Sequence, residues 1–159
     1  CHWTTRQLSS RDINYLEKLP LTINKGDFTL VHGSPREPIW EYVSSTSIAL
    51  HNFAFFQSQF CLVGHSHVPV IFKYEGDSCS ASMFAPNVGL ALGQSQLIIN
   101  PGGVGQPRDG DPRASYAIYD SEARLIRLYR ITYNIEATQN KMMEAGLPVH
   151  LVTRLSIGL

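Results

Sequence analysis

Three short apolar runs in this sequence each end in a glycine and a polar side chain that could serve chemistry. Such runs, bounded by turn residues, are typical of strands buried within a sheet. Ligand sites in layered α/β proteins gather beyond the carboxyl ends of such strands. If the three strands are neighbours, His32, His65, His67 and Asn100 converge at one edge of the sheet. The runs are FTLVHG (28–33), QFCLVGHSH (59–67) and SQLIINPGG (95–103).

The rest of the sequence predicts a mixed α/β layered domain without internal repeats. A helix is expected to start at a Ser9–Ser10 cap and to stop before Pro20, with Ile13, Leu16 and Leu19 on one apolar face. The further elements expected are one or two helices over 39–57, a strand over 68–76 that turns at 76–78, an antiparallel pair of strands at 114–120 and 124–134, and a helix over 135–146 capped by Gly146.

Composition narrows the class of protein. The 159 residues suit one domain with its own core, and 43% hydrophobic with 16% charged residues is typical of a soluble globular protein. Thirteen basic and thirteen acidic residues cancel, so no overall field attracts nucleic acid or a membrane surface, and any affinity for phosphate must be local. No run is long enough to span a membrane, and the N-terminus lacks a signal-peptide pattern. Cys1, Cys61 and Cys79 form no C-x-x-C pair, which favours a reduced, cytoplasmic setting.

The two histidines of the Gly-His-Ser-His element, His65 and His67, are the strongest sign of a metal site. Neutral imidazole is a favoured ligand of zinc and also suits iron, copper and nickel. His32 taken alone is more typical of a turn residue bonded to a backbone carbonyl, but three histidines at strand ends favour a site. The other histidines are expected at a helix boundary (His51) or in solvent near the termini (His2 and His150).

These motifs resemble those of the calcineurin-like metallophosphoesterases, in particular their compact bacterial and archaeal branch. The resemblance rests on VHGSP (31–35), VGHSHVP (63–69) and NPGGVGQPRDGDPRASYAIYD (100–120), and it extends over essentially the whole chain. It implies a metallo-dependent phosphatase fold, which is a β-sandwich flanked by helices. It also implies hydrolysis of a small phosphodiester or phosphomonoester by a hydroxide that two divalent metal ions (Mn, Fe, Zn or Ni) activate. By this resemblance His32 and His65 ligate one ion, and His67 ligates the other.

The sequence lacks the motifs that carry the carboxylates in this family: an Asp-x-His, a bridging Gly-Asp and a Gly-Asn-His. Gly-Asp pairs occur at 26–27, 76–77 and 110–111, but none follows a strand in the right order before His32. Two dications about 3.5–4 Å apart repel each other by on the order of 17 kcal/mol at an effective dielectric of about 20, and neutral imidazoles offset none of this. We therefore expect residues 1–159 to be the C-terminal part of a single metallophosphoesterase domain whose N-terminal half is missing here. Such a chain would bind one metal ion loosely and would be inactive alone, because the general acid also belongs to the missing half.

The loop GGVGQPRDGDPR offers local positive charge for a phosphate group. Arg108 or Arg113 could clamp phosphate through a planar guanidinium. Equally, Arg108 could pair with Asp109, and Arg113 with Asp111, inside a turn-rich loop. Asn100 could orient a ligand, or it could cap the turn that follows it.

Readings from other classes of protein stay open. A non-catalytic binding or scaffold module on the same fold would suit a chain without the carboxylate motifs, and it predicts no metal-dependent turnover. An N-terminal nucleophile hydrolase would use Cys1 with its own amine as the base. A structural Cys/His zinc site is a weaker reading, because the three cysteines are scattered. Four aromatic residues could line a base-stacking pocket or belong to the core: Trp40, Tyr42, Phe55 and Phe56.

Overall fold

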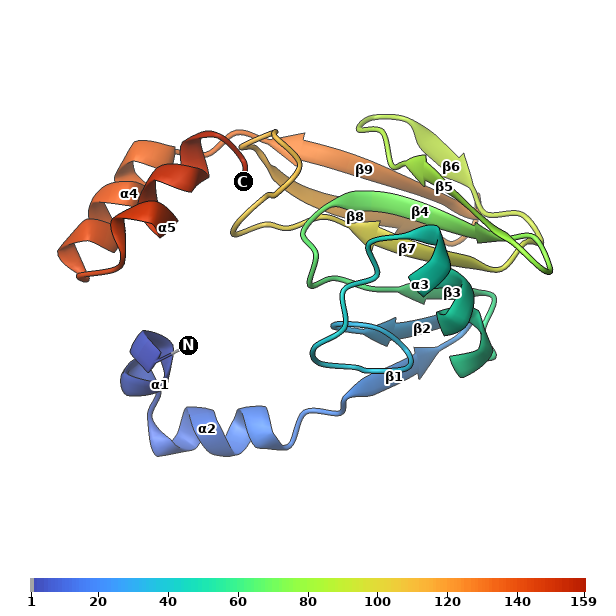
Figure 1. The fold of residues 1–159 in the computed structure, drawn as a ribbon, viewed down its shortest axis with the longest axis horizontal. Helices are drawn as coiled ribbons and strands as arrows, with labels where there is room; N and C mark the ends of the chain where they lie inside the picture. The colour runs from blue at the N-terminus through green and yellow to red at the C-terminus, as the bar shows by residue number, and fades with distance from the viewer. Residues whose placement is uncertain (1) are drawn as a thin grey trace.

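The computed structural model describes residues 2–159, which form two packed sheets with helices around them (Figure 1). Sheet A has six strands in the order β1-β2-β3-β7-β4-β5, and sheet B has three in the order β6-β9-β8. The layered α/β sandwich predicted from the sequence is confirmed. The strands are β1 (Thr22–Lys25), β2 (Phe28–Val31), β3 (Phe60–Leu62), β4 (Pro69–Tyr74), β5 (Cys79–Met83), β6 (Gly89–Ala91), β7 (Leu97–Pro101), β8 (Ala114–Asp120) and β9 (Leu125–Ile131). The helices are α1 (His2–Gln7), α2 (Ser10–Glu17), α3 (Thr46–Asn52), α4 (Ile135–Glu144) and α5 (Val149–Thr153), with 3-10 turns η1 (Phe53–Phe55) and η2 (Arg154–Ser156).

Strands β2, β3 and β7 are parallel neighbours within sheet A. A strand covered on both faces is apolar at every position rather than at alternate ones. Phe60 and Cys61 of β3, and Ile98 and Ile99 of β7, are accordingly completely buried. Because parallel strands end at the same edge of a sheet, the segments that follow β2 and β3 lie side by side, next to the end of β7.

Two hydrophobic clusters hold the layers together, one on each face of sheet A. Successive residues of a strand point to opposite faces, so Phe60 and Ile99 join the cluster between the two sheets, whereas Cys61 and Ile98 join the cluster beneath α3. From sheet B, the fully buried Leu128 closes the inter-sheet cluster. Burial of each such large apolar side chain contributes about 1.5–3 kcal/mol, so these clusters fix the central strands and the edge at which they end.

The N-terminal segment, α1, α2 and β1, lies outside both clusters. Strand β1 belongs to sheet A, whereas α1 and α2 stand away from the two sheets (Figure 1). The predicted helix start is confirmed, because Ser9 Oγ accepts from the Asp12 N–H at 3.2 Å and an Asp12 oxygen accepts from the Ser9 N–H at 2.9 Å, the reciprocal bonds of a capping box. The predicted apolar face is also present, yet Ile13 is 38% and Leu16 is 47% exposed. No part of the chain that the structure describes buries this face.

Most of the other expected elements are confirmed, including strand β4, the antiparallel pair β8 and β9, and helix α4 followed by Gly146 at φ +68°. The helix predicted over 39–57 is wrong in its first part. Helix α3 begins only at Thr46, behind a Ser45 cap, because the preceding segment is held as a loop by its own hydrogen bonds. Strands β1, β5 and β6 and helix α5 were not predicted, since they are short or lack an alternating pattern.

Two further expectations concern the cysteines and the membrane. Cys61 and Cys79 are free thiols, and Cys1, considered above as a nucleophile, lies outside the described residues. Between His2 and the C-terminus, no helix combines the length and the apolar character that crossing a membrane requires.

Candidate metal site at the strand ends

The structure brings the histidines predicted from the sequence to one edge of sheet A. His32 follows β2, and His65 and His67 follow β3, its parallel neighbour. Backbone hydrogen bonds extend the pairing past the strand ends: the Gly64 N–H donates to the His32 carbonyl at 2.9 Å, and the Val63 N–H donates to the carbonyl of the next strand at 3.0 Å. The three imidazoles are therefore carried by backbone that the sheet itself holds in place.

His32 and His65 face each other with their ring nitrogens. His32 Nε2 and His65 Nδ1 are 2.9 Å apart, with ring centroids 4.8 Å apart and planes inclined by 64°. Two nitrogens that bind one ion at about 2.0–2.1 Å, at a right angle to each other, are about 3 Å apart. The observed separation is that of a hydrogen bond between the two rings, and it also fits two adjacent ligands of a single metal ion.

His65 and His67 both have a left-handed backbone conformation, with φ of +61° and +59°. A side chain at such a position is strained, and strain of this kind persists only where the surroundings impose it. Asn100 imposes it here. Its side-chain amide nitrogen donates to the Gly64 carbonyl at 2.7 Å and to Ser66 Oγ at 2.9 Å, on the residues that flank His65.

Asn100 also fixes the turn that follows β7. Its side-chain oxygen accepts the Gly102 N–H at 2.8 Å, so the turn-capping role considered from the sequence is confirmed. The residue is completely buried, and its amide is bonded entirely within the chain. Its geometry is that of a residue that positions the histidine loop.

His67 is held from the loop after β7. Its Nδ1 lies 2.6 Å from the Gln106 carbonyl oxygen. A carbonyl can only accept, so Nδ1 carries the proton and Nε2 is left as the nitrogen that can bind a metal. Histidines that bind metals typically donate their other ring N–H to a backbone carbonyl in this way. Gly103 leaves room for the ring, because a Cβ there would lie 3.2 Å from His67 Cγ.

His65 has two further neighbours on the loop after β2. The backbone of Trp40 makes a hydrogen bond with it, and the ring of Tyr42 lies 4.0 Å from its ring, centroid to centroid. Burial lowers the pKa of His65, its electrostatic interactions with His32, His67 and Arg108 lower it further, and the Trp40 hydrogen bond acts in the opposite direction. The net lowering favours the neutral imidazole, the form that binds metals.

Glu41 organises that loop and was not singled out from the sequence. Its carboxylate accepts from Ser34 Oγ at 2.6 Å and from the Asn52 amide at 2.8 Å, and it forms an ion pair with Arg36. Burial alone would raise the pKa of Glu41, but the hydrogen bonds from Arg36, Asn52 and Ser34 outweigh it and lower the pKa to about 2. The only sequence signal for this role was the cluster of proline, serine and charged residues directly after His32.

The two arginines proposed for phosphate lie in different surroundings. Arg113 pairs with Asp111 at 2.6 Å, as one reading of the sequence expected, and its hydrogen bonds lower the pKa of that carboxyl to about 2. The predicted pairing of Arg108 with Asp109 is wrong, because Asp109 pairs with Arg130 instead. Arg108 lies beside the histidines: its backbone N–H donates to the His67 carbonyl at 3.3 Å, and its charge acts on His65.

The donors at this edge are nitrogens without carboxylates. Across residues 2–159, no three or more His, Cys, Asp and Glu side chains are grouped so that they could hold a metal ion by themselves. The geometry of His32 and His65 nevertheless fits a shared ion, and the free nitrogen of His67 is oriented by its backbone partner. These residues therefore fit the neutral part of a metal site and lack its anionic part.

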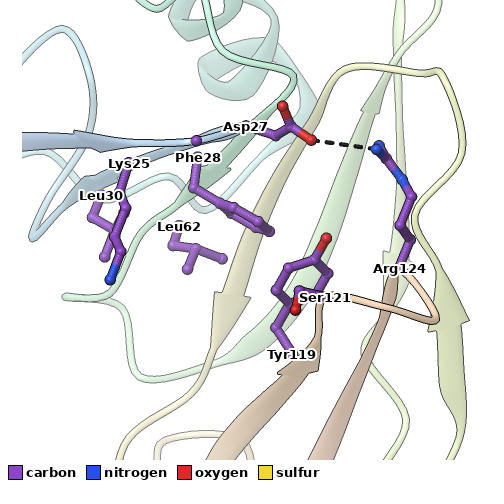
Figure 2. A pocket seen from close by; sticks show the side chains of 9 residues that line it. Lys25, Asp27, Phe28, Leu30, Leu62, Tyr119, Ser121 and Arg124 are labelled. Atoms are coloured by element: carbon purple, nitrogen blue, oxygen red, sulfur yellow. Dashed lines mark hydrogen bonds and ion pairs between the residues drawn. The ribbon is translucent and has the colours of Figure 1, made fainter.

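An apolar trough runs along sheet A toward the histidine edge. Its first pocket, about 790 Å³, is walled by Phe28, Leu30 and Leu62 from sheet A and by residues of the β8–β9 hairpin, and the Arg124–Asp27 ion pair lies at its rim (Figure 2). A second pocket of about 390 Å³ shares Leu30 and Leu62 and continues to His32. The trough, defined by these two pockets, extends from the space beside the β8–β9 hairpin to His32 at the candidate metal site.

Comparison with known proteins gives concordant findings. A family model described as calcineurin-like phosphoesterase superfamily domain matches residues 5–124. The uncharacterised protein MJ0912 of Methanocaldococcus jannaschii is 34% identical in an alignment of 167 positions, gaps included, that covers 98% of this chain and 63% of that protein. The crystal structure of a metallophosphoesterase from Sphaerobacter thermophilus matches with a TM-score of 0.94 and 46% identity, over 99% of this chain and 65% of its own.

A more distant structure shares the fold alone. The hypothetical protein PH1004 from Pyrococcus horikoshii OT3 is 18% identical and matches with a TM-score of 0.73, over 98% of this chain and 57% of its own. The chain thus spans less than two thirds of the length of each of these three proteins.

Proposed function

The chain belongs to the calcineurin-like phosphoesterase superfamily, and from this premise we propose that its strand-end histidines form the neutral part of a metal-dependent phosphoesterase site. The observation that carries the proposal is the 2.9 Å separation of His32 Nε2 and His65 Nδ1, the geometry of two ligands to one ion. His67, through its free Nε2, is the ligand proposed for a second ion. The identity of the ions, manganese, iron, zinc or nickel, follows supply as much as ligand type.

In the proposed reaction the substrate is a small phosphate ester, either a phosphodiester or a phosphomonoester. Divalent ions at such a site lower the pKa of water and polarise the phosphoryl oxygen. The residues of this chain would position the metal ligands and the phosphate for that chemistry. Asn100, the Gln106 carbonyl and the Trp40 backbone hold His65 and His67 in place, the Gly64 N–H holds the His32 backbone, and Arg108 attracts the phosphate.

Arg108 is the better placed of the two arginines for this role. Its Nη2 donates to Gln106 Oε1 at 3.2 Å, while its Nε is buried without a hydrogen-bond partner among the described residues. A buried donor without a partner is costly, and a ligand that supplies an acceptor removes that cost. The guanidinium of Arg113, in contrast, already donates hydrogen bonds to Asp111.

The proposal includes the domain to which the chain contributes. Residues 1–159 would be the C-terminal part of a single domain, and the carboxylate ligands and the general acid would come from the remainder. Three observations support this: no carboxylate cluster accompanies the histidines within residues 2–159, the relatives are longer by more than a third of their own length, and the trough and the apolar face of α2 lie uncovered.

Cobalt(II) titration of the chain tests the metal site directly, because the visible absorption of cobalt reports nitrogen ligands. We expect weak binding of one ion, and a loss of affinity of about tenfold or more in His32→Gln and in His65→Gln. His51→Gln is the matched control, since His51 is exposed on α3 and its Nδ1 bonds to the Ser47 carbonyl. Equal cobalt binding by all three variants would refute the proposed site.

Turnover is tested in a fusion that supplies the part of the Sphaerobacter relative that this chain does not match. The fusion should hydrolyse bis(4-nitrophenyl) phosphate when Mn²⁺ is added, and His67→Gln should abolish this hydrolysis. The scaffold alternative is favoured by the absence of a carboxylate cluster in the described residues. It predicts a folded, metal-binding fusion without turnover.

A further inference from the structure

The loop between β7 and β8 (residues 102–113) brings two groups to the candidate metal site. The Gln106 carbonyl oxygen lies 2.6 Å from His67 Nδ1, and the charge of Arg108 acts on His65. The Arg108 backbone N–H also donates to the His67 carbonyl at 3.3 Å. The position of this one loop therefore decides how the His67 ring is oriented and where the charge of Arg108 lies.

The start of this loop is held by Ser115 on β8. Ser115 Oγ donates to the Pro101 carbonyl at 2.7 Å, and the Ser115 N–H donates to the Gly103 carbonyl at 3.1 Å. Arg130 on β9 is the direct partner of Ser115 in the antiparallel register. Residues opposite each other in such a pair point to the same face of the sheet, so Arg130 reaches the loop from the same face as Ser115.

Arg130 holds the later part of the loop with a guanidinium that is almost removed from solvent. Its side chain is only 4% exposed, and it forms an ion pair with Asp109. Its Nη1 donates to the Arg113 carbonyl at 3.0 Å, and its Nε lies 3.7 Å from a carboxylate oxygen of Asp111. One planar group thus contacts three residues of the loop, which suits the rigid fork of an arginine.

An ion pair this far inside a protein contributes little to stability by itself. The cost of removing two charges from water offsets their attraction, so that apolar replacements of a buried pair are often neutral or stabilising. What the pair of Arg130 and Asp109 does provide is a fixed geometry, because the guanidinium accepts its partners in few directions. The site can use that geometry, since Asp109 directly follows Arg108 in the loop.

We propose that Arg130 is a positioning residue of the candidate metal site, which acts through the loop between β7 and β8. It keeps the Gln106 carbonyl against His67 and keeps Arg108 beside the histidines. The proposal rests on the proposed function, because it concerns that same site. With the loop held, His67 keeps the tautomer that leaves Nε2 free for a metal ion. With the loop released, a neutral imidazole has no reason to prefer this tautomer, and Nε2 becomes protonated in part of the molecules.

NMR correlation of the His67 ring nitrogens in the metal-free chain tests this role, at about pH 8, well above the usual imidazole pKa of about 6.5. The unaltered chain should show the Nδ1–H tautomer alone. The key variant combines Asp109→Leu with Arg130→Met, because it removes both charges together and leaves no buried charge unpaired. It should unfold at an unchanged urea concentration, yet show a mixture of the two His67 tautomers. The single variant Arg130→Gln should show the same mixture together with a loss of stability.

Arg124→Gln is the matched control, since it breaks another pair of arginine and aspartate. Arg124 pairs with Asp27 at 3.4 Å, and both side chains are about half exposed. Asp27 directly precedes β2, at the end of that strand away from His32. The control should keep the Nδ1–H tautomer of His67.

A folded double variant that keeps the Nδ1–H tautomer overturns the proposal. Other contacts, such as the Gly110 N–H to the Gly158 carbonyl at 2.9 Å, would then hold the loop. A double variant that fails to fold overturns it as well, because the pair would then serve stability. If cobalt binds at His32 and His65 in either case, the positioning role alone fails. If the cobalt titration of the unaltered chain refutes the metal site, the proposed function fails, and the role of Arg130 fails with it.

Discussion

The histidine edge (His32, His65, His67 and Asn100) and the N-terminal segment (α1, α2 and β1) differ in what the chain itself provides. At the edge, the completely buried amide of Asn100 makes two hydrogen bonds to the histidine loop, where two residues have a strained backbone conformation, and a third to the turn after β7. In the N-terminal segment none of the residues is buried, although the helix start is formed and the apolar face of α2 is regular.

This difference shows which structures form from a few local residues and which need tertiary packing. Caps and turns form wherever their own few residues allow it, and α2 shows that they do not depend on burial. The strain at His65 and His67, in contrast, persists only because β7 and the loop after it are packed against them. The edge is therefore fixed by tertiary packing, whereas the N-terminal segment is formed locally and is not buried by the described residues.

The largest expected effect is at the residue that holds the edge together. Asn100→Ala should lower the free energy of unfolding by about 2–4 kcal/mol, since it leaves the Gly64 carbonyl and the Gly102 N–H unpaired inside the protein and opens a cavity. Urea unfolding measures it, with the exposed Asn140→Ala on α4 as the control. A loss no larger than that of the control would mean that Asn100 does not fix the histidine loop.

The second largest loss of unfolding free energy is expected for a substitution of Gly102. Its φ is +81°, and an added Cβ would lie 2.2 Å from Ser115 Oγ, so Gly102→Ala combines backbone strain with a clash. We expect a loss of about 2–3 kcal/mol in unfolding free energy. Gly105→Ala, in the same loop but with nothing within 4 Å of its Cβ, should stay within about 0.5 kcal/mol. Equal effects would show that the turn after β7 is not constrained.

The contribution of Glu41 to the stability of the loop after β2 should depend on pH. Its folded-state pKa of about 2 lies below the usual value of 4.5, so its contribution to stability is complete above about pH 4.5 and is lost as the pH falls toward 2. Glu41→Gln should therefore cost about 1–3 kcal/mol at neutral pH and progressively less in acid. Urea unfolding at a series of pH values measures this. The exposed Glu122→Gln should show neither effect, and a pH-independent difference for Glu41 would contradict the assignment.

The smallest effect is expected in the N-terminal segment. Leu16→Glu places a charge on the uncovered face of α2 and should change the unfolding free energy by no more than about 0.5 kcal/mol, while reducing binding of the dye ANS. The fully buried Leu128→Ala, by comparison, should cost about 2–5 kcal/mol. A large loss from Leu16→Glu would show that residues of this chain do cover α2.

Sequence reasoning found the edge because its signals are local. An apolar run followed by glycine and histidine marks a strand end, and three such runs in parallel neighbours place His32, His65 and His67 together. It could not find Glu41, whose role depends on Asn52 folding back from α3 onto the loop after His32. It also misplaced the partner of Asp109, because Arg130 lies on β9 and reaches that loop only through the tertiary fold.

The central claim is that specific ring nitrogens at the histidine edge bind metal. NMR correlation of the imidazole nitrogens during a Zn²⁺ titration tests it at the level of single atoms. The account predicts that the signals of His32 Nε2 and His65 Nδ1 shift together to the metal-bound range, while His67 Nδ1 stays protonated toward the Gln106 carbonyl. Shifts confined to His51 or His150, with His32 and His65 unchanged, would contradict it.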